Sequence, residues 1–233
     1  MLSLNPTETF PGGVPTKLSA TIDAKNLSFT NSMKSRLKAL EKFADADLEW
    51  LMVEHYQFSA RNPAFLATAA SNTETLEDKA IALELHRNFN EEKSHAAMYR
   101  RALKDVGVDV EARVEFAPTS EFFEKVQGLL TGSPDCTVGA MYATETAAIF
   151  EHEVFWEISR EVARRRGVTW EGSRLKHFHD MHLDGVEQSH KDGLADFVDR
   201  NPPGSKERAD TSLGAIEAIE AMVRWWNALL AHL

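Results

Sequence analysis

Residues 137–150 read Thr-Val-Gly-Ala-Met-Tyr-Ala-Thr-Glu-Thr-Ala-Ala-Ile-Phe, and this stretch decides the fold because Glu145 is its only charged side chain. A helix that is apolar nearly all round is buried, so the stretch predicts a central helix surrounded by others. Gly139, Ala143 and Ala147 are small enough for a neighbouring helix to come close. A lone buried carboxylate is costly unless it is protonated, paired or bound to a metal. Glu145 therefore predicts either a buried ion pair with an arginine or a metal ligand.

Prolines and glycines divide the rest of the chain into long segments without strand-like alternation. Pro134 suits the first turn of the central helix, and Gly167 suits its C-terminal cap. Pro63 predicts a break in the helix before it. The further helices are expected at about residues 31–60, 75–106, 119–130, 173–199 and 205–233, with a short turn at 65–70. The pattern predicts an all-α, single-domain bundle of about seven helices over residues 27–233, after an irregular N-terminal arm at 1–26.

Composition excludes several classes of protein. With 233 residues, 43% hydrophobic and 27% charged, the chain has enough apolar residues for one core. Its net charge of −10 argues against a nucleic-acid partner, because phosphate binding needs a basic face. Cys136 is the only cysteine, so an internal disulfide or a multi-thiolate metal site cannot form. No long uncharged stretch or signal peptide is visible, so we expect a cytoplasmic protein without a membrane partner.

Two Glu-x-x-His pairs are the first candidates for chemistry, and they are Glu92 with His95 and Glu187 with His190. Side chains three residues apart project from one helical face, and bundle di-metal sites use this spacing to offer a carboxylate and an imidazole together. Each pair alone is weak evidence, because a solvated helical face explains the charged residues around Glu92 equally well. Glu54 is a further candidate, since it is the only acidic residue in an otherwise apolar stretch at 50–58.

Histidines concentrate on the helix expected at residues 173–199, where His177, His179, His182 and His190 fall within 14 residues. At about 100° per residue, His179 and His182 can both approach the side of the helix that carries His190, whereas His177 points elsewhere. A hydrated helix with incidental histidines is the alternative. The sequence alone does not choose between His179 and His182 as a ligand.

Taken in order, three landmarks resemble the haem-oxygenase-like di-iron oxidases and oxygenases, a superfamily that includes CADD-like proteins and shares its fold with the TenA-type thiaminases. The landmarks are the stretches at residues 88–95, 139–145 and 178–190, and the resemblance covers about residues 30–200. It implies a haem-oxygenase-like fold and two Fe(II) ions, which activate O₂ to oxidise a small-molecule substrate by C–C cleavage, desaturation or N-oxygenation. The ligands that it implies are Glu92, His95, Glu145, His182, Glu187 and His190.

One departure from the family pattern concerns the third landmark. The family usually has His-x-x-x-Asp/Glu-x-x-His there, which would place a histidine at position 183, where this chain has Leu183. A single extra residue accommodated as a π-bulge would bring His182 into line, and Gly185 would ease that distortion. Without a bulge, His179 is the substitute.

Other functions compete with the di-iron enzyme. Manganese is the alternative metal, since oxygen and nitrogen ligands suit it as well as iron. Cys136 at the start of the central helix permits a metal-free, TenA-like hydrolase with a cysteine nucleophile, although a small buried cysteine is the simpler interpretation. A non-catalytic helical interaction protein is the third class, because the last helix carries an apolar stripe typical of a core or of a homodimer interface.

Overall fold

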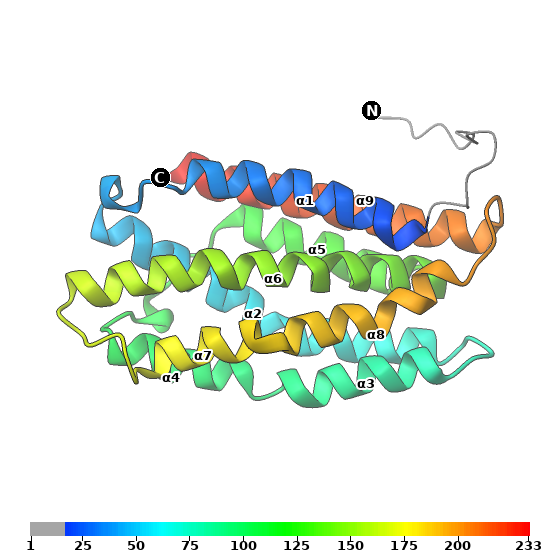
Figure 1. The fold of residues 1–233 in the computed structure, drawn as a ribbon, viewed down its shortest axis with the longest axis horizontal. Coiled ribbons are helices and arrows are strands. Elements are labelled where there is room, and N and C mark those ends of the chain that lie inside the picture. The colour runs from blue at the N-terminus through cyan, green and yellow to red at the C-terminus, as the bar shows by residue number, and fades with distance from the viewer. Residues whose placement is uncertain (1–16) are drawn as a thin grey trace.

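The computed structural model describes residues 17–233, and within that range it contains helices and turns but no strand (Figure 1). This confirms the all-α bundle. If α3 with α4, and α7 with α8, are each taken as one interrupted rod, the described chain forms seven rods. The helices are α1 (Leu18–Arg36), α2 (Asp45–Thr73), α3 (Ala80–Glu92), α4 (His95–Asp105), α5 (Ala117–Leu130), α6 (Pro134–Arg165), α7 (Arg174–Met181), α8 (Glu187–Asp199) and α9 (Lys206–His232).

Helix α6 is the central element, as its apolar sequence predicts. It begins at Pro134 after Ser133, whose hydroxyl accepts a hydrogen bond from the Cys136 amide at 3.3 Å. It packs against α9 on one side and against α2 and α8 on the other (Figure 1). A Cβ atom at Gly139 would overlap the backbone of α9, and one at Gly214 of α9 would overlap the backbone of α6. The two helices therefore touch backbone to backbone, which only glycine permits.

The start of the chain corrects one prediction. Residues 1–16 of the expected arm lie outside the described residues, but α1 already begins at Leu18, where an irregular arm was expected up to residue 26. Leu18, Ile22, Phe29 and Met33 are buried on one face of α1. The helical spacing of these apolar residues was hard to recognise in the sequence, because the residues between them are mostly polar. The α1 terminus is held by Asp199, which accepts hydrogen bonds from the amide and the hydroxyl of Ser19 at 2.9 and 2.6 Å.

Several predicted helix boundaries are also wrong. Residues 31–60 do not form one helix, because α1 ends at Arg36 and α2 begins only at Asp45. Partly buried Pro63 lies inside α2, as does the turn expected at 65–70. The expected helix at 75–106 begins only at Ala80, and Lys93 and Ser94 interrupt it between α3 and α4. That second break matters for function, because it separates Glu92 at the end of α3 from His95 at the start of α4.

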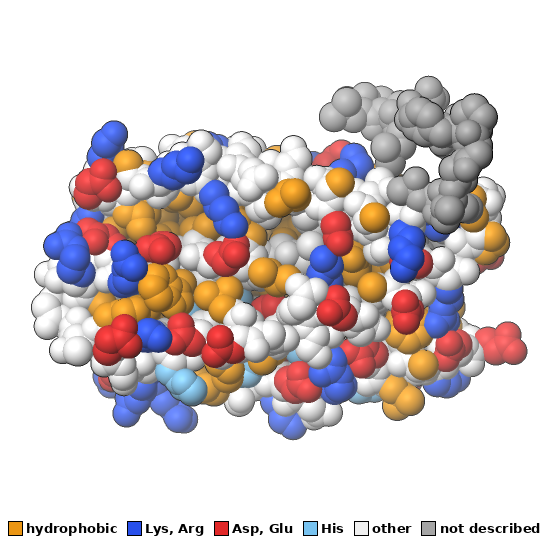
Figure 2. Space-filling view, viewed as in Figure 1, with side chains coloured by type: hydrophobic (Ala, Val, Ile, Leu, Met, Phe, Trp, Pro, Cys, Tyr) orange, Lys and Arg blue, Asp and Glu red, His pale blue; other side chains and the backbone are white. Residues whose placement is uncertain are grey.

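The face drawn in Figure 2 carries both signs of charge, and apolar side chains between them gather into patches, most clearly toward the left of the view. Within residues 17–233, no helix is both long and apolar enough to cross a bilayer.

Candidate metal centre

The structure brings all six residues of the expected ligand set into one buried cluster. They come from the α3–α4 junction, from the middle of α6, and from the segment around the start of α8, and each is at most 7% exposed. Ligand atoms of the first group lie within 4.8 Å of one another, as do those of the second. The first group is Glu92, His95 and His182, and the second is Glu92, Glu187 and His190. Glu145 joins them from α6, with its Oε2 3.4 Å from Nδ1 of His190.

Because of the helix break at Lys93 and Ser94, the first Glu-x-x-His pair spans two helices, with Glu92 at the end of α3 and His95 at the start of α4. Oε1 of Glu92 and Nδ1 of His95 lie 2.9 Å apart, but they are not aligned as a hydrogen bond. A carboxylate oxygen and an imidazole nitrogen that face the same space in this way are the arrangement that two ligands of one cation adopt.

A π-helix at His182–Val186 joins α7 to α8. The sequence left open whether this segment contains a bulge, and the structure has one. Asp184 has φ −77° and ψ 18°, and Gly185 has φ +113°, a backbone conformation that residues with a Cβ rarely adopt. The extra residue turns His182 inward, where it is 2% exposed, and leaves Leu183 36% exposed on the outside. The bulge that the sequence required for His182 is therefore present.

His179 has other partners. Its Nε2 is 2.9 Å from the Ser159 hydroxyl, and its Nδ1 is 3.3 Å from Nδ1 of His152. Because both ring nitrogens are engaged, His179 is not retained in the ligand set.

His190 has the surroundings of an oriented metal ligand. Its Nε2 lies 2.8 Å from Oε2 of Glu91, and Glu91 in turn accepts a hydrogen bond from Arg87 at 2.9 Å. The other nitrogen, Nδ1, faces Glu145 at 3.4 Å and Glu187 at 3.8 Å. A carboxylate that holds the outer nitrogen of an imidazole is the usual support of a metal-bound histidine. Sequence reasoning missed this role of Glu91, since its charged neighbours suggested only a solvated face.

The carboxylates of the cluster repel one another. Burial, followed by the charges of Glu92 and Glu145, raises the pKa of Glu187 well above its usual value. Burial alone would lower the pKa of His190, but the close negative charges of Glu145 and Glu187 and the bond to Glu91 raise it to about 10. Within residues 17–233, no lysine or arginine pairs with any of the three cluster carboxylates. A cation would supply the missing positive charge.

Two buried histidines of the cluster, His182 and His152, are neutral. Burial and the neighbouring His95 lower the pKa of His182 to about 2. Burial and the nearby His182 likewise lower the pKa of His152 well below its usual value. Neutral imidazole is the form that binds metals.

Unpartnered atoms test whether a metal fits. Four buried ligand atoms of the cluster have no hydrogen-bond partner, although almost all buried polar atoms in proteins have one. They are Oε1 of Glu92 and the Nδ1 atoms of His95, His182 and His190. Because each belongs to a side chain of the ligand groups above, two divalent cations with oxygen and nitrogen ligands fit this donor set.

Glu54 lies outside the cluster, and the structure explains its burial differently. Its carboxylate accepts hydrogen bonds from Nε and Nη2 of Arg113 at 2.8 and 3.2 Å, and from the Thr119 hydroxyl at 2.5 Å. A bidentate arginine and a hydroxyl satisfy a buried carboxylate without a metal. Glu54 is therefore a structural ion pair that links α2 to the start of α5, and it is removed from the ligand candidates.

His152 and His55 are buried histidines that the sequence analysis did not single out. His152 lies two turns after Glu145 on α6, with its Nε2 3.6 Å from Oε1 of Glu187. His55 of α2 lies 3.1 Å from the Tyr99 hydroxyl through its Nδ1 and stacks on Phe155 at 3.9 Å. The seven-residue spacing from Glu145 to His152 was the signal that could have identified His152.

Cys136 is in the first turn of α6, nine residues before Glu145, which corresponds to roughly 14 Å along the helix axis. Burial and the charge of Asp210 raise the pKa of its thiol. A nucleophilic cysteine needs the opposite shift.

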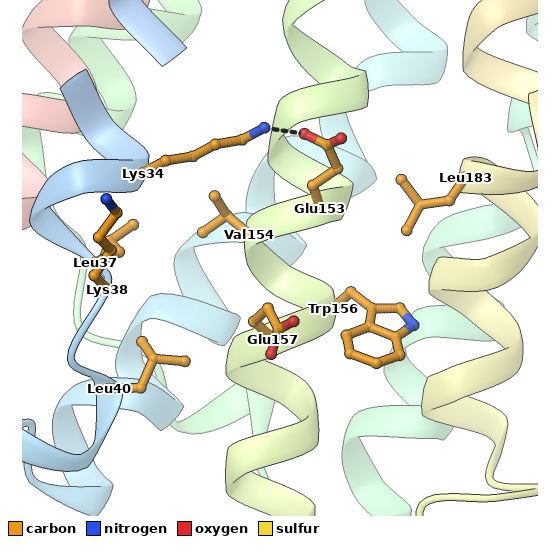
Figure 3. Close-up of a pocket in the computed structure, with 9 residues that line it drawn as sticks. All are labelled: Lys34, Leu37, Lys38, Leu40, Glu153, Val154, Trp156, Glu157 and Leu183. Carbon is orange, nitrogen blue, oxygen red and sulfur yellow. Dashed lines mark hydrogen bonds and ion pairs between the residues drawn. The ribbon is translucent and has the colours of Figure 1, made fainter. Parts of the chain in front are cut away.

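A surface groove of about 540 Å³ runs along the outer side of α6, between α1 and the π-helix (Figure 3). Lys34 and Glu153 form an ion pair across it, and Leu183 and Trp156 line the opposite side. His152 and His182 are buried, while the residues that follow them, Glu153 and Leu183, line the groove. The groove and the cluster thus border different faces of the same two segments.

Together the helical bundle and the buried carboxylate–histidine cluster define an all-α protein with a candidate di-metal centre. The fold is haem-oxygenase-like, as comparison with solved structures shows. A CADD-like protein of unknown function from Nostoc punctiforme superposes with a TM-score of 0.80 at 22% identity, over 92% of this chain and 96% of that one. A domain of unknown function with a heme oxygenase-like fold from Shewanella denitrificans gives 0.72 at 14% identity, over 94% of both chains.

A TenA homologue from P. horikoshii is also similar, with a TM-score of 0.67 at 10% identity over 93% of this chain and 99% of that chain. No family model and no curated protein matches the sequence. At these identities the likeness concerns the fold alone.

Proposed function

We propose that this chain is a non-haem di-iron enzyme that uses O₂ to oxidise a small molecule. The observation that carries the proposal is the set of four unpartnered ligand atoms beside three carboxylates that, within residues 17–233, have no lysine or arginine partner. Buried polar atoms in protein cores almost always have hydrogen-bond partners, so a set of four unpartnered atoms is unusual. A pair of divalent cations would give each of these atoms a partner.

In this proposal Glu92 and His95 would hold one metal, Glu187 and His190 would contribute to the second, and His182 lies within reach of both groups. Glu145 faces His190 from α6, so its carboxylate would contribute to the metal that His190 holds. Bound Fe(II) would supply O₂ activation and the oxidising power, which no protein side chain offers. Manganese prefers the same donor atoms and is the alternative metal.

The chain's own residues orient and isolate the centre. Glu91 fixes the ring of His190, and the rings of Phe178 and Tyr99, stacked at 4.3 Å, pack beside the buried histidines. Such packing excludes water from the side of the centre next to α4 and α7. Asn88 lies one turn before Glu92 with both amide atoms buried and unpartnered, so it offers a polar contact to a bound small molecule. C–C cleavage, desaturation and N-oxygenation all remain compatible with these groups.

The competing functions have less support. The raised pKa of the Cys136 thiol disfavours a metal-free hydrolase, and such an enzyme would leave the cluster without a role. The apolar stripe of α9 faces inward, with Met222, Trp225, Trp226 and Leu229 at most 1% exposed, so it forms core rather than a surface for a partner. A homodimer stays a prediction, because the apolar stripe of α9 that suggested it lies in the core.

Metal analysis tests the proposal. After anaerobic loading with Fe(II), we expect the parent to hold about two ions per chain and to develop new optical absorption on exposure to O₂. Glu145→Ala should lose most of the metal, because it removes the buried carboxylate that the central helix contributes to the centre. Glu153→Ala changes an exposed carboxylate on the same helix and is the matched control. Metal content in Glu145→Ala equal to that of the parent would refute the assignment of Glu145, and absence of metal from the folded parent would refute the function.

A further inference from the structure

His152 is a buried imidazole of the cluster that the six-residue ligand set leaves out. It projects from α6 two turns beyond Glu145, is 5% exposed, and meets the π-helix across the core. Its ring centroid lies 3.8 Å from that of His182, and its Nε2 lies 3.6 Å from Oε1 of Glu187. Ligand atoms of these three residues lie within 4.8 Å of one another.

The hydrogen bonds of His152 leave one ring nitrogen for a cation. Its Nδ1 is 3.3 Å from Nδ1 of His179, and Nε2 of His179 is 2.9 Å from the Ser159 hydroxyl. If His152 donates its Nδ1 proton to His179, then His179 donates its Nε2 proton to Ser159. The lone pair of Nε2 on His152 then faces Glu187. This is the tautomer that a metal-bound histidine adopts when a partner holds its other nitrogen.

The competing arrangement has the same hydrogen bonds with donors and acceptors exchanged. Ser159 would then donate to His179, His179 to Nδ1 of His152, and Nε2 of His152 to Glu187. The distance of 3.6 Å from that nitrogen to the Glu187 oxygen is too long for a good hydrogen bond. The distance suits two ligands of one cation instead, since such atoms do not contact each other directly. Nε2 of His182, which is 2% exposed, faces the same oxygen of Glu187 at 3.9 Å.

We propose that His152 is a seventh protein ligand of the centre, which forms a two-histidine, one-carboxylate position with His182 and Glu187. This inference rests on the proposed metal-binding function and extends its ligand set to four histidines and three carboxylates. Two imidazoles and a carboxylate with open positions suit Fe(II) and other divalent first-row cations. His179 and Ser159 are positioning residues, because they act on the metal only through the ring of His152.

Substitution with Co(II) provides a count of bound histidines. Each imidazole bound to Co(II) contributes one exchangeable N–H resonance, shifted far outside the ordinary proton NMR range and absent in D₂O. We expect four such resonances from the parent, and one fewer from His152→Gln, together with a dissociation constant for the more weakly bound Co(II) raised about tenfold or more. His179→Gln should retain the His152 resonance but speed its exchange with water, because only the hydrogen-bond partner is lost.

The outcomes separate the two proposals. Three shifted resonances in the parent, or an unchanged spectrum and affinity in His152→Gln, would overturn the role of His152 while leaving the six-ligand centre intact. A folded parent that binds no Co(II) would overturn the metal-binding function itself. If His152→Gln does not fold, the count of four or three resonances in the parent decides the matter.

Discussion

Glu91 shows how much one residue outside a ligand set can matter. It touches no candidate metal position, but it holds Nε2 of His190 at 2.8 Å and is itself held by Arg87. This arrangement directs Nδ1 of His190 toward Glu145 and Glu187. An imidazole without that bond is free to rotate about its side-chain torsions, so the loss of the bond weakens binding without removing any ligand.

We therefore expect Glu91→Gln to weaken Fe(II) binding by about 10- to 100-fold while the fold remains intact. A competition titration against a chromophoric chelator under anaerobic conditions measures this change. Glu84→Gln is the matched control, because Glu84 also binds Arg87 but does not contact His190. Equal affinities in the parent and in Glu91→Gln would show that packing alone orients His190.

At the residue scale, the sequence could predict those side chains that stand out by their neighbours. Glu145 is isolated in an apolar stretch, and the two Glu-x-x-His pairs share a recognised spacing. Glu54 stood out in the same way, but it pairs with Arg113, which lies far away in sequence. No local pattern distinguishes a buried carboxylate beside an arginine from one beside histidines, because the partner is set by tertiary packing. His152 was missed although its seven-residue spacing from Glu145 was a usable signal.

At the scale of elements, the interruptions of the helices are what position the ligands. Lys93 and Ser94 separate α3 from α4, and the π-helix separates α7 from α8. The sequence indicated the second interruption through Gly185, since a known spacing was off by one residue. It gave no sign of the first, because neither Lys93 nor Ser94 breaks helices strongly. Pro63 wrongly suggested a helix end, because the free-energy cost of a proline inside a long packed helix is smaller than the stabilisation that the packing provides.

The π-helix yields a prediction about Gly185, whose φ of +113° disfavours any side chain. We expect Gly185→Ala to lose about 1 kcal/mol or more of stability and also to weaken metal binding, because relief of the strain moves His182. Gly172→Ala is the matched control, since Gly172 has φ +78°, open space around it and a place in the α6–α7 loop. Denaturant unfolding and Fe(II) titration of both variants measure the two effects. If both variants bind Fe(II) as tightly as the parent, the π-helix does not govern the position of His182.

Hydrogen exchange tests the same element in the parent protein. Without a cation, the carboxylates repel one another and the π-helix lacks regular backbone bonds, so local opening there is easy. Amides from His177 to Gly193 should therefore be markedly better protected with Fe(II) than without it, because metal binding and ordering are coupled. Amides from Val138 to Ile149 on the packed central helix should change little. Equal protection in both samples would mean that packing alone orders the π-helix.

At the scale of the whole molecule, the cluster governs how stability depends on pH when metal is absent. Four buried histidines stay neutral in the fold, with the pKa lowered to about 2 for His182, to about 3 for His179, and below the usual value for His55 and His152. Burial, only partly offset by a hydrogen bond from Trp226, raises the pKa of Glu151 to about 7, and the pKa of Glu187 is also raised well above its usual value. Because the pKa values of the histidines are lowered and those of the two carboxyl groups are raised, the two kinds of group change the stability in opposite directions as pH rises.

We expect the stability of the metal-free protein to be greatest near pH 6.5. Below that value unfolding lets the four histidines take up protons, and this uptake exceeds the release from the two carboxyl groups down to about pH 4.5, so stability falls on acidification. Above it the folded protein retains protons that the unfolded chain releases, on Glu151 up to a pKa of about 7 and on His190 up to a pKa of about 10, so stability falls as pH rises. Urea unfolding between pH 4.5 and 9 measures the profile. A steady rise in stability across this range would contradict the assignment.

The π-helix also affects how this chain is aligned with others. A π-turn contains one residue more than the α-turn it replaces, so it acts as an insertion inside a helix, where alignments rarely place a gap. An ungapped alignment that matches Glu187 and His190 with the ligands of a regular helix puts Leu183 opposite the missing histidine. A gap of one residue between His182 and Glu187 restores all three positions together. Relatives with the same centre can thus be overlooked by any search that demands fixed spacing across this helix.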